Sequence, residues 1–538
     1  MKKTHRKEKI KVKKDGLQKP AKEDNVSERE IQTVRELLDT AARDYGNRTF
    51  IKFADGDNII EKSYITLRDN SYAISRYIRS FSQERMHIAI IGKTNYEYLT
   101  CLTGILISAN VSVPFAPDIS VEEACDLFER ADIDMLFYED DFEPSAREIS
   151  RRYGKFKNMV NLGSRETFEE IYKKYSEDSE YAYLSEVETD PEKCAAIIFT
   201  SGTTGKRKGV MLSTRNLISN INYKELEFGE DDVVLSVLPM HHIFCYSGDF
   251  LKTIKDGVAV CLNGDLSQIG RNLQRFEPTI IRAVPMICST LLRKVQAYER
   301  RNPDLTPRQA AEAVFGRRFK WLISAGAYLS PKLVSDYAKY GIMLRQGYGM
   351  TETGPRVSIS VFSDYRADSS GKIISICQVR TQNGEIQVKS PSVMMGYYKD
   401  PEETKAAFTE DGWLKTGDLG RITDDGYIYI TGRVKNLIIL SNGENISAEE
   451  IERRFCDEPL VKEVVAYGEN DMITAEIFPD TAYAQEHGIE DIRSSLEMLI
   501  NKANENTNAY TEIGALKIRE TPFPKTASGK IKRNIVTF

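Results

Sequence analysis

The chain has 538 residues, of which 41% are apolar and 29% are charged, and its formal net charge is -6. A chain of this length exceeds what one hydrophobic core supports, so we expect two or more domains. The net negative charge argues against a protein dedicated to nucleic-acid binding. Eight cysteines are scattered without a CxxC pair or a Cys/His cluster, which indicates reduced thiols in a cytoplasmic protein and no zinc site.

The first 28 residues are rich in lysine but lack the apolar stretch of a signal peptide. We therefore expect residues 1–28 to form a disordered, charged tail. A weak contact with anionic lipid or a partner is the alternative, so any membrane contact would be peripheral. No apolar run approaches the ~18 residues that a membrane span needs. Residues 28–46 have the apolar spacing of a helix, for which Ser27 is a candidate N-cap.

Apolar strands and amphipathic helices alternate along the following part of the chain. The predicted strands are HIAIIG, AAIIFT, DVVLSVLP, VAVCL, TIIRAVP and FKWLISAG, with helix-sized segments between several of them. This alternation predicts an α/β domain with parallel or mixed sheets.

One of these strands, Ala195 to Phe199, runs directly into a loop of hydroxyl residues, glycines and basic residues. Glycines let backbone N–H groups approach an anion closely, and hydroxyl and basic side chains add donors and charge. The spacing is not that of a Walker A motif, because only two residues separate the glycines. The loop is predicted to bind phosphate through Thr200, Ser201, Gly202, Thr203, Thr204, Gly205 and Lys206.

The pattern changes from about Gly384 onward. GEIQVKS, DGWLKTGDLGRI and YIYITGR predict a small antiparallel meander with glycine-containing turns. After Gly432, a helix at 448–455, strands VKEVVAYG and MITAEIFP, and helices at 489–505 predict a separate α+β domain.

Four further motifs follow the phosphate loop in order: GYGMTE at 347–352, TGD at 416–418, GRVK at 432–435 and KTASGK at 525–530. Together with the loop, they resemble the acyl-adenylate-forming, or AMP-binding, superfamily, which includes acyl-CoA synthetases, luciferases and peptide-synthetase adenylation domains. Two departures are visible. Arg207 stands where the family loop usually has Pro, and in the turn at 324–327 the following residue is Tyr328 instead of Pro.

The resemblance implies an N-terminal AMP-binding domain at 29–432, a hinge at 433–436 and a small mobile C-terminal domain at 437–538. Lys435 would be the hinge residue. The family rotates its small domain between two reactions, so Lys530 would face the nucleotide in the first. In the second, the loop that contains Gly443 would help to form a thiol tunnel.

The resemblance also implies individual roles in the nucleotide site. Glu352 would hold Mg²⁺, and Thr351 would contact the α-phosphate. Asp418 would accept hydrogen bonds from the ribose hydroxyls, with Arg433 beside it. Tyr348 would stack near the adenine, and Gly326 and Ala327 would form the adenine wall. Lys530 is the predicted catalytic lysine, because a mobile cation there could bridge the carboxylate and the α-phosphate.

The segment LPMHHIFCY is informative about the class of acid substrate. In the family a histidine at the place of His242 borders the acyl pocket, although a packed structural histidine is a fair competitor. Amino-acid-activating relatives carry an Asp in this segment, and its absence here favours an uncharged acyl tail. The motifs look most like those of fatty acyl-CoA synthetases.

The sequence therefore predicts a ligase that uses ATP and Mg²⁺ to convert a small-molecule carboxylic acid, with a fatty acid as the favoured class, to acyl-AMP and then to a CoA thioester. An enzyme that loads the phosphopantetheine arm of an acyl carrier protein is the first alternative. An inactive nucleotide-binding or interaction protein is an alternative of another class. Nothing in the chain specifically supports a luciferase-type monooxygenase.

Overall fold

The computed structural model describes residues 31–176, 187, 190–200, 206–226, 228–361, 364–440, 445–505, 507–525 and 531–533. The predicted tail at 1–28 lies outside these ranges. Ser201 to Gly205, Gly443 and Lys530 also lie outside them. Within the described part of the chain, every helix is too short or too polar to cross a membrane.

The largest sheet has nine strands, and its central six are parallel. Antiparallel strands flank them on both sides. In spatial order the strands are β15 (Lys372–Ile373), β14 (Arg356–Ile359), β13 (Met343–Gly349), β12 (Trp321–Ser324), β11 (Ile280–Ala283), β9 (Val233–Ser236), β10 (Ala259–Leu262), β1 (Thr49–Asp55) and β2 (Asn58–Ser63).

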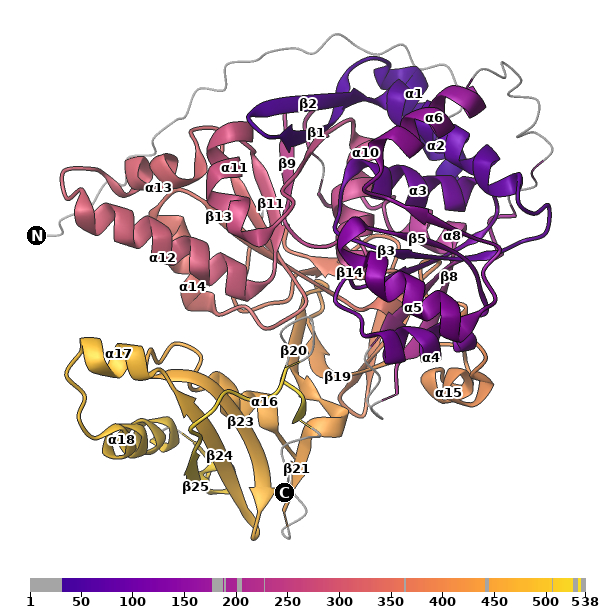
Figure 1. Ribbon diagram of the computed structural model, residues 1–538. Helices are drawn as coiled ribbons and strands as arrows, with labels where there is room; N and C mark the ends of the chain where they lie inside the picture. Colours follow the sequence, from indigo (N-terminus) through magenta and orange to yellow (C-terminus); the bar gives the residue numbers. More distant parts are fainter. Residues whose placement is uncertain are drawn as a thin grey trace, which may run out of the picture. The chain divides into compact units, whose positions relative to one another are not determined.

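Four helices cover part of this sheet: α11 (Ile269–Phe276), α12 (Pro285–Arg301), α13 (Pro307–Phe315) and α14 (Pro331–Lys339). Figure 1 shows them grouped beside β9, β11 and β13. One apolar core joins these helices to the parallel strands; Leu235, Leu273, Cys288 and Tyr337 are among its fully buried members.

A second sheet of seven strands carries the predicted phosphate loop. Its order is β18 (Gly396–Tyr397), β8 (Lys208–Ser213), β7 (Cys194–Thr200), β4 (Val111–Phe115), β3 (His87–Ile91), β5 (Ile133–Tyr138) and β6 (Asn158–Asn161). The strands from β7 to β6 are parallel, whereas β8 and β18 are antiparallel. The other α-helices described between residues 34 and 407 are α1 (Val34–Tyr45), α2 (Tyr64–Arg79), α3 (Tyr96–Ile107), α4 (Val121–Ala131), α5 (Glu143–Tyr153), α6 (Arg165–Ser176), α8 (Thr214–Ser219), α9 (Ile243–Cys245), α10 (Lys252–Asp256) and α15 (Pro401–Ala407).

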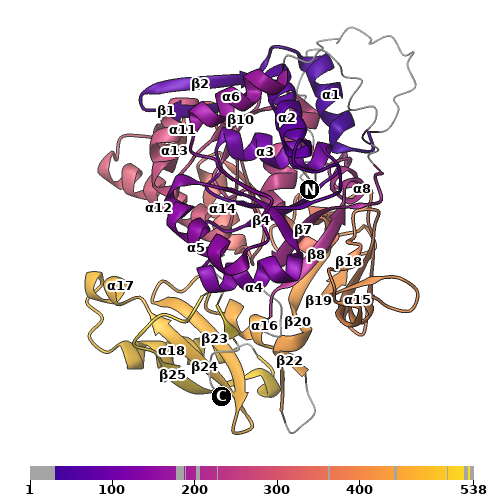
Figure 2. The same cartoon turned by 45° about the vertical axis from the view of Figure 1, so that its right-hand side comes forward.

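A four-stranded antiparallel sheet follows, with the order β16 (Gln378–Gln382), β17 (Glu385–Lys389), β19 (Leu414–Ile422) and β20 (Ile428–Arg433). The last part contains β21 (Leu437–Ile439), β22 (Asn445–Ser447), α16 (Ala448–Arg453), β23 (Val461–Glu469), β24 (Met472–Pro479), α17 (Thr481–Glu486), α18 (Ile492–Asn504) and β25 (Ile513–Ile518). Figure 2 shows β23, β24 and β25 side by side with α18 next to them. A separate apolar core, which includes Ile451, Ala475 and Leu496, holds this α+β unit together.

Several boundaries differ from the sequence prediction. The first helix begins at Val34, not at 28, because the hydroxyl of Thr33 caps it by accepting from the backbone N–H of Glu36 at 3.2 Å. Thr33, and not Ser27, therefore caps this helix, and Ser27 itself lies outside the described residues. The antiparallel pair β1 and β2 was not predicted, although its turn contains an Asp-Gly pair typical of hairpins.

Candidate functional site

The predicted phosphate loop leaves the end of β7, where Thr200 pairs with Lys208 of β8. Lys206 is exposed. Arg207 Nε lies 2.5 Å from Glu123 Oε1, and Lys208 forms an ion pair with Glu403. Two of the three basic side chains thus have acidic partners in this structure, and Lys206 is the one that projects into solvent.

The motif at 347–352 ends in a tight turn, the 3₁₀ segment Thr351–Thr353, which follows β13. A side chain at Gly349 would place a Cβ atom 1.8 Å from the carbonyl oxygen of Pro355. The backbones at Gly349 and Pro355 therefore approach each other at a distance that only glycine permits. Thr351 is half-buried and Glu352 is buried. The turn therefore presents a buried carboxylate beside a hydroxyl at the end of a parallel strand.

Glu352 Oε1 accepts a hydrogen bond from the Tyr397 hydroxyl at 3.0 Å. Burial raises the pKa of the Glu352 carboxyl, although the hydrogen bond from Tyr397 and the charges of Arg433 and Lys208 oppose the rise. The Lys208 ammonium lies 5.0 Å from the centre of the Tyr397 ring. Nothing in the sequence marks Tyr397 as a partner of Glu352, since the two stand 45 positions apart.

Asp418 lies on β19 opposite Arg433 of β20. Its Oδ2 accepts from the Tyr348 hydroxyl at 2.7 Å, and its Oδ1 lies 2.6 Å from Arg433 Nε. The carboxylate is 5% exposed, and burial raises the pKa of Tyr348 well above its ordinary value. The structure therefore brings together three predicted site residues that belong to three separate sequence motifs.

Gly326 and Ala327 follow the end of β12 and are both exposed. Gly326 has a φ of +85°, and a Cβ atom added there would meet nothing within 4 Å. The turn thus leaves open space at the carboxyl end of the parallel sheet, where α/β proteins bind ligands.

The predicted hinge begins where β20 ends. Val434–Asn436 form a 3₁₀ turn in which Lys435 is exposed. Just before it, a Cβ atom on Gly432 would lie 2.0 Å from the hydroxyl of Ser447, the residue that caps α16, so the start of α16 lies close to β20. Glu449 of α16 accepts from the backbone N–H of Arg433 at 3.3 Å.

The two ends of the predicted catalytic-lysine loop are described, although Lys530 is not. Lys525 and Ile531 form an antiparallel bridge, and Lys525 Nζ lies 2.5 Å from Glu463 Oε1. Arg533 forms an ion pair with Glu452. Both ends of the loop are therefore attached to the C-terminal unit.

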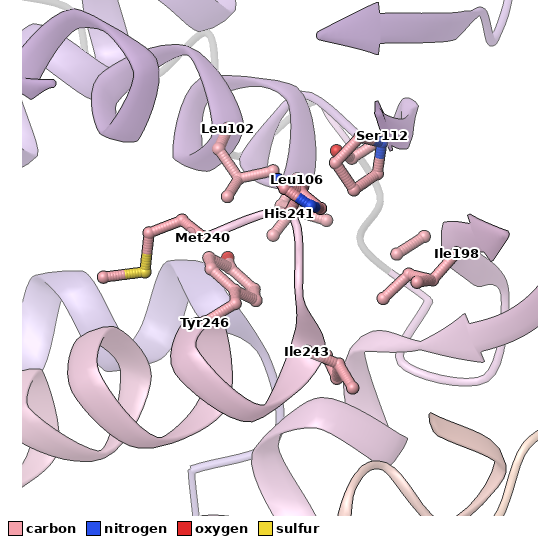
Figure 3. Close-up of a pocket in the computed structure, with 10 residues that line it drawn as sticks. Leu102, Leu106, Ser112, Ile198, Met240, His241, Ile243 and Tyr246 are labelled. Atoms are coloured by element: carbon pink, nitrogen blue, oxygen red, sulfur yellow. The ribbon is translucent and has the colours of Figure 1, made fainter. Parts of the chain in front are cut away.

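His242 stands at the start of α9 and is exposed. The neighbouring His241, whose ring centre lies 4.2 Å from that of His242, instead lines a small apolar cavity. The cavity holds about 10 Å³, enough for about one water molecule. Its wall includes Leu102, Leu106, Ile198, Met240, Ile243 and Tyr246 (Figure 3). Burial lowers the pKa of His241 to about 3, so its ring is neutral at physiological pH.

The only sequence signal for His241 was its position beside His242. The family resemblance pointed to His242, and the structure places its neighbour against the cavity. Among the described residues, no group of three or more His, Cys, Asp or Glu side chains could hold a metal ion. A metal at Glu352 would therefore need oxygen ligands from substrate phosphates, as Mg²⁺ commonly has.

Comparison with known proteins gives matches along most of the chain. The family described as AMP-binding enzyme matches residues 38–398, and the AMP-binding enzyme C-terminal domain matches residues 435–537. The long-chain-fatty-acid–CoA ligase FadD15 of Mycobacterium bovis is 27% identical over 435 residues, which cover 71% of each chain. The malonate–CoA ligase of Arabidopsis thaliana is 28% identical over 475 residues, covering 83% of this chain and 76% of that one.

Among solved structures, the anthranilate CoA ligase AuaEII in complex with anthranoyl-AMP superposes with a TM-score of 0.78. It is 18% identical, and the match covers 94% of this chain and 96% of that one. The predicted α/β fold with a small antiparallel sheet and a C-terminal α+β unit is confirmed.

Proposed function

The chain belongs to the AMP-binding enzyme family as an acid–thiol ligase of the AMP-forming acyl-CoA synthetase type, and we propose that it activates a small-molecule carboxylic acid with ATP and transfers the acyl group to CoA. The resemblance to the acyl-adenylate-forming superfamily is thereby confirmed. The contact network of Tyr348, Asp418 and Arg433, next to the buried Glu352, carries the proposal, because it supplies a fixed anionic acceptor beside a second carboxylate.

In the first step, a carboxylate oxygen of the acid attacks the α-phosphorus of ATP, and the bond to pyrophosphate breaks. In the second, the thiol sulfur attacks the acyl carbon as it loses its proton, and the bond to AMP breaks. Both steps require charged groups to be held at fixed positions away from bulk water. The contacts that hold Asp418 and Glu352 in place support this requirement.

Asp418 is proposed to hold the ribose. A carboxylate accepts through two oxygens that offer about four lone-pair sites, which suits the two hydroxyls of a ribose. The adenine would lie between Tyr348 and the turn at Gly326 and Ala327. The phosphate chain would extend toward Thr351 and the loop from Thr200 to Lys206.

Glu352 fits a role in binding Mg²⁺, because it presents a single buried carboxylate with one tyrosine donor and no ion pair to a lysine or arginine of the described residues. When bound, the ion would reduce repulsion between the acid and the phosphates. Tyr397 would orient the carboxylate, and burial would keep bulk water from competing for its oxygens.

We propose the domain boundaries as expected: an N-terminal domain at 29–432, a hinge at 433–436 with Lys435 at its centre, and a C-terminal domain at 437–538. Rotation at the hinge would exchange Lys530 for the loop containing Gly443. The attachment of both ends of the Lys530 loop to the C-terminal unit supports this, because the lysine would then move with the unit as a whole.

A fatty acid is the first acid to test, because a long-chain-fatty-acid–CoA ligase is among the relatives of the chain. A carrier-protein phosphopantetheine arm is the alternative acceptor. The experiment incubates the full-length protein with ATP, Mg²⁺ and a panel of acids, first without and then with CoA or a carrier protein that bears the arm. Acid-dependent AMP release with CoA supports the proposal. AMP release with the carrier protein but not with CoA would identify the carrier protein as the acceptor. No AMP release with any acid would favour the inactive nucleotide-binding alternative.

A further inference from the structure

A cluster of buried charges lies outside the contacts discussed so far. Arg282 of β11 and Asp249 form an ion pair at 2.8 Å, and neither side chain has any exposed surface. Arg356 of β14 is also buried, at 4% exposure. The Nε and Nη2 atoms of Arg282 and both Nη atoms of Arg356 have no hydrogen-bond partner in the described part of the chain.

Each of the two guanidinium groups lies over an aromatic ring. Arg282 lies 5.1 Å from the centre of the Phe228 ring, and Arg356 lies 4.6 Å from the centre of the Tyr223 ring. A guanidinium stacked on a ring still directs its N–H bonds outward in its own plane. The rings therefore pack against both groups but do not accept the hydrogen bonds of their unpartnered N–H donors.

The cluster contains more positive than negative charge. Lys252 also lies there, 5.2 Å from the Tyr223 ring centre, but it is paired with Asp256 at 2.5 Å. Asp249 forms its ion pair with Arg282. Among the ion pairs of the described residues, none joins a carboxylate to Arg356. A buried cation without a partner is costly, so this arrangement favours an anion that is supplied from outside the chain.

A single glycine brings the two arginines to the same place. A Cβ atom on Gly248 would lie 3.1 Å from Arg282 Cδ and 3.5 Å from Arg356 Nη2. Gly248 belongs to the helical segment Tyr246–Leu251, and Tyr246 of that segment lines the apolar cavity beside His241. The cationic cluster and the apolar cavity therefore meet on one short segment.

The cluster also adjoins the proposed nucleotide site. Arg282 lies near the carboxyl end of β11, in register with Ser236 of β9 and Ile323 of β12, and ligands of α/β proteins bind at that edge. Arg356 comes four residues after Glu352 in the chain. Asn220 joins the two regions, since its amide donates to the carbonyls of Thr353 and Arg356 at 3.3 and 3.1 Å.

From this juxtaposition we infer that the acid substrate carries a second carboxylate, which Arg282 and Arg356 bind while the first reacts with ATP. The inference rests on the proposed function and narrows its substrate class from small-molecule carboxylic acids to aliphatic dicarboxylic acids. The second carboxylate of such an acid would supply the anion for the guanidinium donors that have no partner among the described residues. A simple fatty acid would leave the cluster without its anion, whereas a carboxylate can take paired N–H donors from each arginine.

The test compares matched pairs of acids: propionate with malonate, butyrate with succinate, hexanoate with adipate, and octanoate with suberate. The full-length protein is assayed for AMP release with ATP, Mg²⁺ and CoA. For at least one pair, the diacid should have a kcat/KM about tenfold or more above that of the monoacid, since hydrogen bonds to a charged group contribute this much. Equal or better use of the monoacid in every pair would overturn the inference.

Arg356→Met is the main variant because Arg356 has no acidic partner among the described residues whose charge would be left buried. It should lower kcat/KM for the preferred diacid about 10- to 100-fold while leaving the matched monoacid unchanged or improved. Arg147→Met, at an exposed arginine of α5 paired with Glu143, is the matched control and should change neither. Equal losses for diacid and monoacid in Arg356→Met would contradict the assignment.

Binding of ATP to Arg356→Met, measured by calorimetry, checks that the variant is folded. If it is not, Arg356→Lys replaces it, since lysine keeps the charge but loses the paired donors. We then expect a loss that is confined to the diacid but smaller than for methionine, and an equal loss for both acids would overturn the inference. If the wild-type protein releases no AMP with any acid, the proposed function itself fails, which is a different result from a failure of diacid preference.

Discussion

Asp418→Asn tests the ribose contact most directly, because it keeps the size of the side chain and removes only its charge. In the structure the carboxylate is 5% exposed and is held between Tyr348 and Arg433 at 2.7 and 2.6 Å. A hydrogen bond to a charged acceptor is worth about 1.5–3 kcal/mol, and one to a neutral acceptor about 0.5–1.5 kcal/mol. Wild type should therefore prefer ATP to 2′-deoxy-ATP about 10- to 150-fold, and the variant only about 2- to 10-fold.

The assay is acid-dependent exchange of pyrophosphate into ATP, measured with both nucleotides. The KM for ATP should rise about tenfold in Asp418→Asn, since both ribose hydroxyls lose a charged acceptor. Asp411→Asn is the control, because Asp411 forms an equally close pair with Arg380, at 2.7 and 2.9 Å, but is exposed. If Asp418→Asn still disfavours 2′-deoxy-ATP as strongly as wild type, Asp418 does not bind the ribose.

Three further predictions concern the metal, the two reactions and pH. Glu352→Ala should slow pyrophosphate exchange by ~10²-fold or more through loss of a group that offsets transition-state charge, and a near-normal rate would exclude the metal role. Lys530→Ala should impair acyl-AMP formation but should still transfer the acyl group of supplied acyl-AMP to CoA. Lys435→Pro should form acyl-AMP but fail in this transfer, if proline holds the domains in the adenylating arrangement. Equal slowing of both half-reactions by each variant would contradict the proposed hinge. Burial raises the pKa of Glu452 from 4.5 to about 7 despite its pairing with Arg533, so the folded protein keeps a proton that the unfolded chain loses, and this contribution to stability falls as pH rises from about 4.5 to about 7. The unfolding free energy of Glu452→Gln relative to wild type, from urea titrations, should therefore increase across that window, and a constant difference would refute the burial argument.

The local pattern of the chain was enough to predict the class of fold. Period-two and continuous apolar runs, such as Ala195 to Phe199, identify strands by themselves, because burial on one or both faces dictates which side chains a strand carries. The motif around Asp418 was likewise recognisable, since the turn and the carboxylate are neighbours in sequence. Boundaries were harder to predict: the first helix begins where the Thr33 hydroxyl caps it, and nearby serine and threonine residues compete for that role.

Contacts between segments that are distant in the chain could not be predicted from local sequence patterns. The hydrogen bond from Tyr397 to Glu352 and the position of His241 against the cavity depend on how separate strands and helices pack. The same holds for the charge cluster. Arg282 interrupts the apolar run TIIRAVP, and only the packing around it shows which groups face it.

The sequence by itself indicated the chemistry that the chain can attempt, because the loops proposed to bind phosphate, ribose and metal place their donors and acceptors within a few residues of one another. Only the tertiary structure decided which charges are balanced. The free energy of a buried arginine depends on burial and on partners such as Asp249, which lies 33 positions away from Arg282. The packing of β11, β14 and the segment Tyr246–Leu251 buries Arg282 and Arg356 and leaves several of their N–H donors without partners among the described residues. That property belongs to the fold as a whole.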